Sequence, residues 1–225
     1  MDQGRGFNEM AHALDIPDSL FCRCRRWSEG LRPLKDMGSC IGYMERELPE
    51  LLEDGDLFRE ILRAIVERDS YPDINTDTMF VNEIVLFRDP VRGFSLRICL
   101  WGPGEYDPVH DHNSWGVIGT VSGCLTVVGY RRLDGGMDER CAVIEEAGRE
   151  LLPVGCTYSV LPLNQGIHCT GNADASAIVQ VGVYGKNLTG RNYIHAFDPA
   201  TGEISRLYSP QAKKRMLARQ ALLSL

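Results

Sequence analysis

The stretch from about residue 79 to residue 209 constrains the fold most, because short apolar or alternating runs follow one another there without helical spacing. Gly, Pro, Asp and Asn separate these runs, as they do where strands end in turns. Regular short strands with no helical pattern between them predict an antiparallel sandwich or barrel of jelly-roll type. The expected strands are Phe80–Phe87, Phe94–Trp101, Trp115–Val121, Cys124–Tyr130, Cys141–Glu146, Tyr158–Leu161 and Ala175–Tyr184.

Helical patterns flank this region on both sides. From Ser19 to about Arg68 the apolar residues recur at helical spacing with charges between them. Tyr71-Pro72-Asp73 ends that pattern, because proline cannot continue a helix. The tail from Pro210 to Leu225 is helical again. We therefore expect one structural domain: a helical section over residues 1–75 packed on a barrel over 76–209, and a C-terminal helix over 210–225.

Charge and composition limit the partners that we expect. The 225 residues carry a net charge of -7, and Lys213-Lys214-Arg215 is the one short basic run. This balance predicts no nucleic-acid and no membrane partner. No stretch approaches the roughly 18 apolar residues of a transmembrane helix, and the N-terminus lacks the basic-then-apolar order of a secretion signal. The sequence predicts a cytoplasmic protein and leaves its oligomeric state open.

Eight cysteines are scattered along the chain. A chain of this length can bury a core without disulfides, so free and mostly buried thiols are expected. Cys22 and Cys24 form a Cys-x-Cys pair, which is half of a possible zinc site. No second pair is spaced to complete that site, so zinc binding there is a minor alternative.

The histidines are the strongest candidates for chemistry. His110 and His112 alternate, and alternate side chains of a strand share one face, so both imidazoles are expected to point the same way. His168 is the third candidate, at the end of turn residues that lead into another strand. A lone histidine on an apolar face is more often a hydrogen-bonded core residue than a ligand. The combination of the three is what favours a metal site.

The spacing of glycines, prolines and histidines resembles the two-part motif of the cupin superfamily. The residues that carry the resemblance are Gly104, His110, His112, Gly123, Pro162, Gly166, His168 and Asn172. It implies a double-stranded β-helix barrel in which the two motif strands face each other and the three histidines converge. The usual glutamate after the second histidine is absent from residues 113–117, so the predicted site has three histidines alone.

Two metals suit such a site. Three neutral imidazoles leave a divalent ion its full charge and about three open positions, which suits Fe(II), an anionic substrate and O₂. Zn(II) with three histidines and a water is the competing assignment and favours hydrolysis or hydration. Ligand type alone does not separate the two.

Five segments extend the resemblance to one family. They are Phe94–Gly104, Pro108–His112, Trp115–Gly119, Val183–Asn187 and His195–Gly202. Together they resemble the bacterial branch of the type I cysteine dioxygenase family over roughly residues 81–209. Members of that family are mononuclear non-haem Fe(II) enzymes that use O₂ to convert a small thiol, such as cysteine or 3-mercaptopropionate, to its sulfinic acid. The resemblance implies the same cofactor and reactants here.

Only some of the family's catalytic residues have a counterpart in this sequence. Tyr184 matches the tyrosine whose hydroxyl points at the iron site. A serine and a histidine precede that tyrosine at alternate positions in the family, but Gln180 and Gly182 stand there in this sequence. The cysteine that some members cross-link to the tyrosine has no counterpart near Gly116 and Val117. The hydrogen-bonded relay of the family is therefore predicted to be missing.

A carboxylate-bearing substrate needs a cation at its far end, best an arginine that binds both oxygens. Glu83 stands where the family often places an arginine. Arg97 shares a strand face with Trp101, and the resemblance turns that face toward the lumen. We expect Arg191 ahead of Arg97 to bind substrate, because members that oxidise 3-mercaptopropionate use an arginine in that later segment. Each arginine could equally belong to a surface ion pair.

Two further functions remain open at the level of sequence. The missing relay favours another three-histidine cupin dioxygenase, which would act on a diketone or an aromatic ring. A cupin that binds a metal or small ligand without turnover, as a sensor or storage module, is the other alternative.

Overall fold

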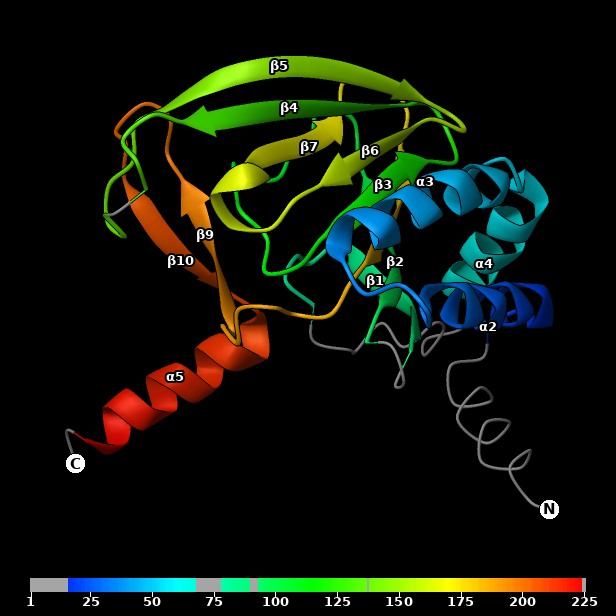
Figure 1. Ribbon diagram of the computed structural model, residues 1–225, viewed down its shortest axis with the longest axis horizontal. Coiled ribbons are helices and arrows are strands. Elements are labelled where there is room, and N and C mark those ends of the chain that lie inside the picture. Colours follow the sequence, from blue (N-terminus) through cyan, green and yellow to red (C-terminus); the bar gives the residue numbers. More distant parts are fainter. Residues whose placement is uncertain (1–15, 68–77, 90–92, 137, 224–225) are drawn as a thin grey trace.

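The computed structural model describes residues 16–67, 78–89, 93–136 and 138–223. The predicted break at Tyr71-Pro72-Asp73 and the N-terminal residues read for a secretion signal lie outside these ranges. Figure 1 shows helices against one side of a strand-rich body and a last helix that projects from the opposite end. Among the described residues, no helix has the length and apolar character needed to cross a membrane.

Three helices come first in the described chain: α2 (Asp18–Leu31), α3 (Met37–Leu52) and α4 (Gly55–Glu67). Local chemistry explains where α3 begins. The side chain of Asp36 accepts a hydrogen bond from the backbone N–H of Ser39 at 2.8 Å, which satisfies one of the free donors of the first turn. Each helix buries one apolar face, as the helical spacing predicts.

In the ranges that the structure describes, ten strands follow and form three antiparallel sheets. The larger sheet has the order β1-β2-β8-β3-β6, the second has the order β5-β4-β7, and β9 pairs with β10. The strands are β1 (Glu83–Arg88), β2 (Ser95–Trp101), β3 (Gly116–Thr120), β4 (Cys124–Arg132), β5 (Ile144–Pro153), β6 (Thr157–Val160), β7 (His168–Asn172), β8 (Ile178–Tyr184), β9 (Tyr193–Phe197) and β10 (Ile204–Tyr208).

The two larger sheets face each other across an apolar layer. This layer joins Trp101 and Ile118 of the first sheet to Leu125 and Val127 of the second. The architecture confirms the predicted fold class, a mainly β barrel of cupin type with helices before and after it. One predicted strand, Cys141–Glu146, is wrong in its bounds, because β5 runs over Ile144–Pro153. Most β5 side chains are exposed and its pairing depends on the backbone, so no apolar alternation marks it.

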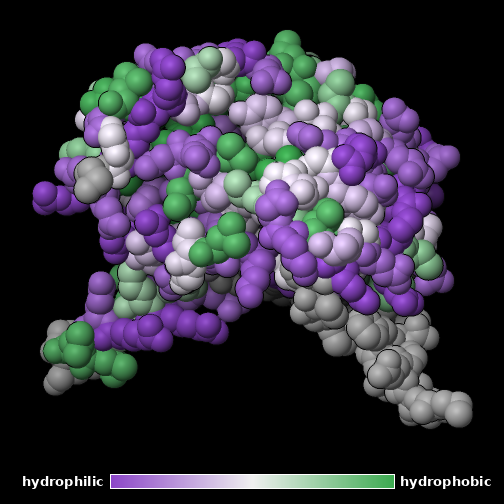
Figure 2. All heavy atoms as spheres, viewed as in Figure 1, coloured by the Kyte–Doolittle hydropathy of each residue, from purple (hydrophilic) through white to green (hydrophobic). Residues whose placement is uncertain are grey.

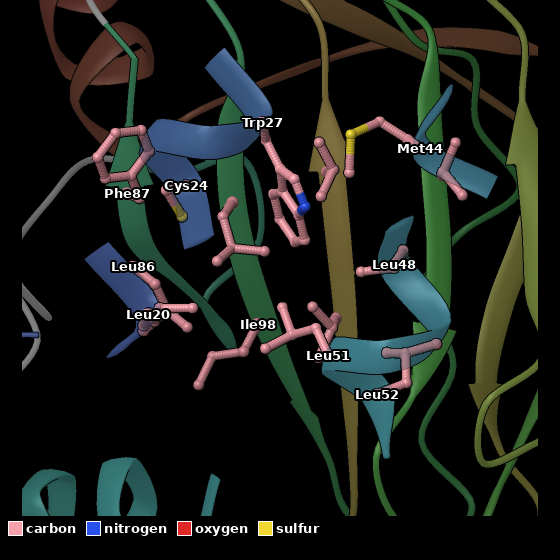
Figure 3. Close-up of a cluster of buried hydrophobic side chains, with 14 of the residues drawn as sticks. Leu20, Cys24, Trp27, Met44, Leu48, Leu51, Leu52, Leu86, Phe87 and Ile98 are labelled. Atoms are coloured by element: carbon pink, nitrogen blue, oxygen red, sulfur yellow. The ribbon is translucent and has the colours of Figure 1, made fainter. Parts of the chain in front are cut away.

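The helices and the larger sheet share one apolar core. Figure 3 shows Trp27 of α2 and Leu48 and Leu51 of α3 directed toward the strand that carries Ile98. All four side chains are fully buried. Since burying such side chains contributes about 1.5–3 kcal/mol each, the helical section stabilises the barrel wall behind the site.

The C-terminal helix α5 (Pro210–Leu222) is confirmed, but it is not packed. Ser209 caps it by accepting a hydrogen bond from the Ala212 N–H at 3.4 Å. None of its residues is buried. Figure 2 shows it as a mainly hydrophilic projection with a hydrophobic group near the free end, where Leu222 and Leu223 are exposed.

All eight cysteines are free, as predicted. The expectation that most are buried is wrong, because only Cys24, Cys99 and Cys169 are buried. Cys22 and Cys24 lie two positions apart on α2, so one side chain faces solvent and the other faces the core. In the described part of the chain the pair belongs to no metal-ligand cluster.

The contact between α3 and the sheet depends on Gly119 of β3. A Cβ atom built there would lie 2.5 Å from the carbonyl oxygen of Cys156 and closer still to a methyl group of Leu52 in α3. The carbonyl belongs to the backbone and cannot turn away. Any side chain at position 119 must therefore displace the backbone at Cys156 and the Leu52 side chain that α3 packs there.

We expect Gly119→Ala to lower the free energy of unfolding by about 1–3 kcal/mol, the usual cost of overpacking a core. Urea denaturation followed by circular dichroism measures this. Gly148→Ala is the matched control, because a Cβ there meets nothing within 4 Å, and its effect should stay within about 0.5 kcal/mol. Equal effects of the two substitutions would contradict this account of the helix–sheet contact.

Candidate metal centre

The segment that carries His110 and His112 is extended but is not a regular strand, so that part of the prediction is wrong. Isolated bridges join His110 to His168 of β7 on one side and to Ala196 of β9 on the other. Regular pairing stops there because the N–H of His195 bonds the carboxylate of Asp111 at 2.7 Å instead of a backbone carbonyl. The bridges still keep the segment extended, so alternate side chains share a face.

The structure brings His110, His112 and His168 together. Their ring centroids lie 4.7, 4.8 and 4.9 Å apart, and one nitrogen of each lies within 4.8 Å of the others. Over the described ranges, this is the one group of three or more His, Cys, Asp or Glu side chains arranged to hold an ion. Its donor set contains no carboxylate, as the sequence predicted.

The hydrogen bonds of the imidazoles leave one nitrogen of each for a metal. His110 Nδ1 bonds the carbonyl of Pro108 at 2.8 Å, and His168 Nδ1 bonds that of Gly166 at 2.8 Å. Such bonds place the ring proton on Nδ1 and leave the Nε2 lone pair free for a cation. His112 Nε2 is buried without a hydrogen-bond partner. A divalent ion would satisfy this orphaned atom, so the residues fit a metal.

Burial keeps the three imidazoles uncharged. Loss of solvent lowers the pKa of His168 to about 4 and holds the pKa of His112 well below the usual range. It also lowers the pKa of His110. A histidine must be neutral to bind a metal. The cluster therefore meets this requirement over the whole neutral pH range.

Tyr184 lies directly beside the cluster. Its ring stacks on that of His112 with the centroids 5.6 Å apart. Burial holds the pKa of Tyr184 well above the usual range, so its hydroxyl stays protonated and can donate a hydrogen bond.

Two glycines make room for the Tyr184 ring and explain the missing relay. A Cβ atom at Gly116 or Gly182 would lie 2.7 or 2.5 Å from ring carbons of Tyr184. Any side chain at position 182, a histidine included, is therefore incompatible with this position of the ring. Gln180 already has a partner other than Tyr184, because its carbonyl oxygen accepts a hydrogen bond from Trp101 Nε1 at 2.8 Å.

The three histidines line a cavity of about 1220 Å³, and Arg97, Trp101 and Arg191 line it too. Arg97 is held by Glu83, with Nη1 and Oε1 2.7 Å apart, and its guanidinium lies 5.3 Å from the centre of the Tyr184 ring. The structure thus places all three predicted substrate-binding residues at the same cavity, and their substrate contacts stay predictions.

Arg191 already has acidic neighbours. Its Nη1 lies 4.0 Å from Asp111 Oδ2 and its Nη2 lies 3.9 Å from Glu139 Oε1. Asp111 in turn lies beside the ring of His195, with Oδ2 and Nδ1 3.2 Å apart. Since Asp111 stands between two candidate ligands, this buried group braces the ligand segment from the side away from the metal site.

Sequence reasoning missed two acidic residues of the site. Asp107 lines the cavity and accepts hydrogen bonds from the N–H and hydroxyl of Thr170 at 2.6 and 2.9 Å. Burial raises its pKa to about 7. Glu83 was noted only as a departure from the family, although opposite charges on neighbouring strands, here Glu83 and Arg97, are a recognisable signal for a pair.

Comparisons with known proteins concern about half of the chain. No model of a known protein family matches the sequence. A cupin 2 conserved barrel domain protein from Salinispora arenicola CNS-205 is 16% identical, with a TM-score of 0.36 over 51% of this chain and 84% of that one. A cupin 2 conserved barrel domain protein from Rhodopseudomonas palustris is 13% identical, with a TM-score of 0.38 over 52% and 67%. An oxalate oxidase is 18% identical, with a TM-score of 0.35 over 48% and 53%.

Removing one imidazole should abolish metal binding. We expect the wild-type protein to hold about one divalent ion per chain and His112→Ala to hold almost none, because two neutral imidazoles bind such ions weakly. Elemental analysis by mass spectrometry after dialysis measures the ratio. Cys156→Ser is the control, since Cys156 is an exposed potential ligand outside the three-histidine group, and equal losses in both variants would contradict the assignment.

The free energy of unfolding of the metal-free protein should decrease as the pH is lowered. An unfolded histidine takes up a proton near pH 6.5, whereas folded His168 does so only near pH 4. Between these values His168 binds more protons in the unfolded state, as do His110 and His112, whose pKa values burial also lowers. These three histidines outweigh the opposite contribution of Asp107, whose pKa is raised in the folded state, so the free energy of unfolding decreases as the pH is lowered. Urea denaturation at several pH values tests this, with His168→Gln expected to show a shallower decrease. A variant that follows the wild-type curve would contradict the burial of a neutral His168.

Proposed function

We propose that this protein is a mononuclear non-haem iron dioxygenase that oxidises a small thiol to its sulfinic acid. The observation that carries the proposal is the group of three uncharged histidines without a carboxylate, two of them buried and His112 half-buried, next to the protonated hydroxyl of Tyr184. The segments that resemble the type I cysteine dioxygenases, His110 to His112 and Val183 to Asn187 among them, supply this same arrangement. Fe(II) held by three imidazoles would supply adjacent positions for a thiolate and O₂.

The reaction balances without an external reductant. A thiolate and O₂ combine to a sulfinate: two sulfur–oxygen bonds form, the O–O bond breaks, and sulfur loses the electrons that the two oxygen atoms gain. A thiol substrate loses its proton before it reacts. A thiolate suits a site of this kind because it is a soft, anionic donor.

The residues of this chain would bind and orient the substrate and exclude water from it. Cys99 and Trp101 form an apolar wall of the cavity, so the reacting groups meet away from bulk solvent. The Tyr184 hydroxyl keeps its proton and can donate to negative charge that develops on the substrate oxygens. Arg97 and Arg191 line the same cavity as the histidines, so the far end of the substrate would lie near them.

A second candidate is a three-histidine dioxygenase that acts on a substrate other than a thiol. The observation that favours it is the absence of the serine–histidine relay, whose places hold Gln180 and Gly182. Oxygen uptake with a diketone or an aromatic substrate, and none with thiols, would support this alternative. Stoichiometric ligand binding with no product would instead support a non-catalytic cupin.

The decisive experiment is an oxygen-electrode screen of the iron-loaded protein with cysteine, cysteamine and 3-mercaptopropionate. We expect oxygen consumption with at least one thiol and a product that has gained two oxygen atoms by mass spectrometry. His112→Ala should abolish both, because it removes one of the three imidazoles. If no thiol supports oxygen uptake while the protein holds iron, the thiol dioxygenase proposal fails.

Tyr184→Phe should lower kcat by about 10- to 100-fold, since a hydrogen bond to a charged group contributes about 1.5–3 kcal/mol. Initial rates of sulfinate formation measure the effect. Tyr158→Phe is the matched control, because Tyr158 also contacts His168, at 6.2 Å between ring centroids, but does not line the cavity. Equal losses in the two variants would show that the Tyr184 hydroxyl has no special role.

A further inference from the structure

We infer that Glu83 makes this cavity select a thiol whose far end is an amine and reject one whose far end is a carboxylate. The inference rests on the proposed function and narrows its substrate class. It starts from the position of Glu83, a buried carboxylate on β1 that lines the same cavity as the three histidines. The group of three histidines does not need an acidic side chain at position 83 to hold a metal.

Glu83 forms an ion pair with Arg97. Oε1 lies 2.7 Å from Arg97 Nη1, and Oε2 accepts a hydrogen bond from the N–H of Met79 at 3.1 Å. Arg97 Nε donates to the Ser95 hydroxyl at 2.9 Å, which fixes the guanidinium plane. The arginine is therefore neutralised by its own neighbour.

This pair adjoins the metal site. The Arg97 guanidinium lies over the Tyr184 ring at 5.3 Å, and that ring stacks on His112 at 5.6 Å. The pair and the three histidines line one cavity, so a substrate with its sulfur at the histidines can reach Glu83 and Arg97 with its far end. The charges of Glu83 and Arg97 therefore decide whether the cavity accepts a substrate that ends in a carboxylate or one that ends in an ammonium group.

Among the described residues next to the Glu83–Arg97 pair, a carboxylate finds no cation that lacks an acidic neighbour. Next to Arg97 it would also lie next to Glu83, and like charges repel strongly where water is excluded. Arg191 already lies near Asp111 and Glu139. Three other described arginines line the cavity: Arg88 at the opposite end of β1 from Glu83, and Arg215 and Arg219 on α5, which projects from the barrel (Figure 1).

An ammonium group fits better. Each carboxylate oxygen can accept two hydrogen bonds, and each oxygen of Glu83 accepts one in the structure. Ser95 and the Tyr184 ring hold Arg97 on the Oε1 side, so an ammonium can approach Oε2. The cavity then pairs the positive end of the substrate with Glu83 while its thiolate reaches the histidines.

Binding to the cobalt-loaded protein tests the inference without turnover. Co(II) is chosen because a thiolate bound to it gives a charge-transfer absorption band, which can be titrated in the absence of O₂. We expect cysteamine to bind at least about tenfold more tightly than 3-mercaptopropionate, a difference of about 1.4 kcal/mol. Equal affinities, or tighter binding of 3-mercaptopropionate, would overturn the selectivity. If neither thiol gives the band, the proposed function fails and the selectivity fails with it.

Two matched variants identify the residue responsible. Glu83→Gln keeps the shape of the side chain but removes its charge, so the preference for cysteamine should fall about tenfold. Glu139→Gln removes the same charge beside Arg191, outside the Glu83–Arg97 pair, and should leave the preference unchanged. A preference that responds to Glu139→Gln but not to Glu83→Gln would assign selectivity to Arg191 and overturn the inference. Should Glu83→Gln fail to fold, the wild-type preference alone decides.

Discussion

The pair of backbone hydrogen bonds between His110 and His168 is the contact on which the site depends. The N–H of each residue bonds the carbonyl of the other, at 2.8 and 3.0 Å. This exchange joins two segments that are far apart in the chain and places their imidazoles side by side. Asp111 and His195 hold the same segment from its other edge. With both edges fixed, the alternation of the backbone alone turns His112 toward the cluster.

The barrel wall behind this contact is rigid because helices support it. The apolar core shared by α2, α3 and the larger sheet holds β2, β3 and β8 in place. Their lumen-facing residues can then meet at fixed distances, as Trp101 and Gln180 do at 2.8 Å. A site that must keep three imidazoles within a few ångströms needs such support, since small displacements weaken metal binding.

Burial gives the site its chemistry as well as its shape. The same loss of solvent keeps the three histidines neutral, keeps Tyr184 protonated and raises the pKa of Asp107 to about 7. Glu83 and Arg97 pair their charges in the lumen. A divalent ion at the three neutral imidazoles would add positive charge there, and an anionic ligand would suit it.

Local patterns in the sequence were sufficient for an antiparallel β fold with flanking helices, and the resemblance to the cupin motif added the candidate ligands His110, His112 and His168. Strand alternation, helical spacing and turn residues act over a few positions, so they can be read directly. The tertiary structure decided the rest: β5 without an apolar pattern, the isolated bridges of His110, the space that Gly182 leaves for Tyr184, and the Glu83–Arg97 pair. These depend on strand register and on contacts between distant segments, which no local pattern specifies.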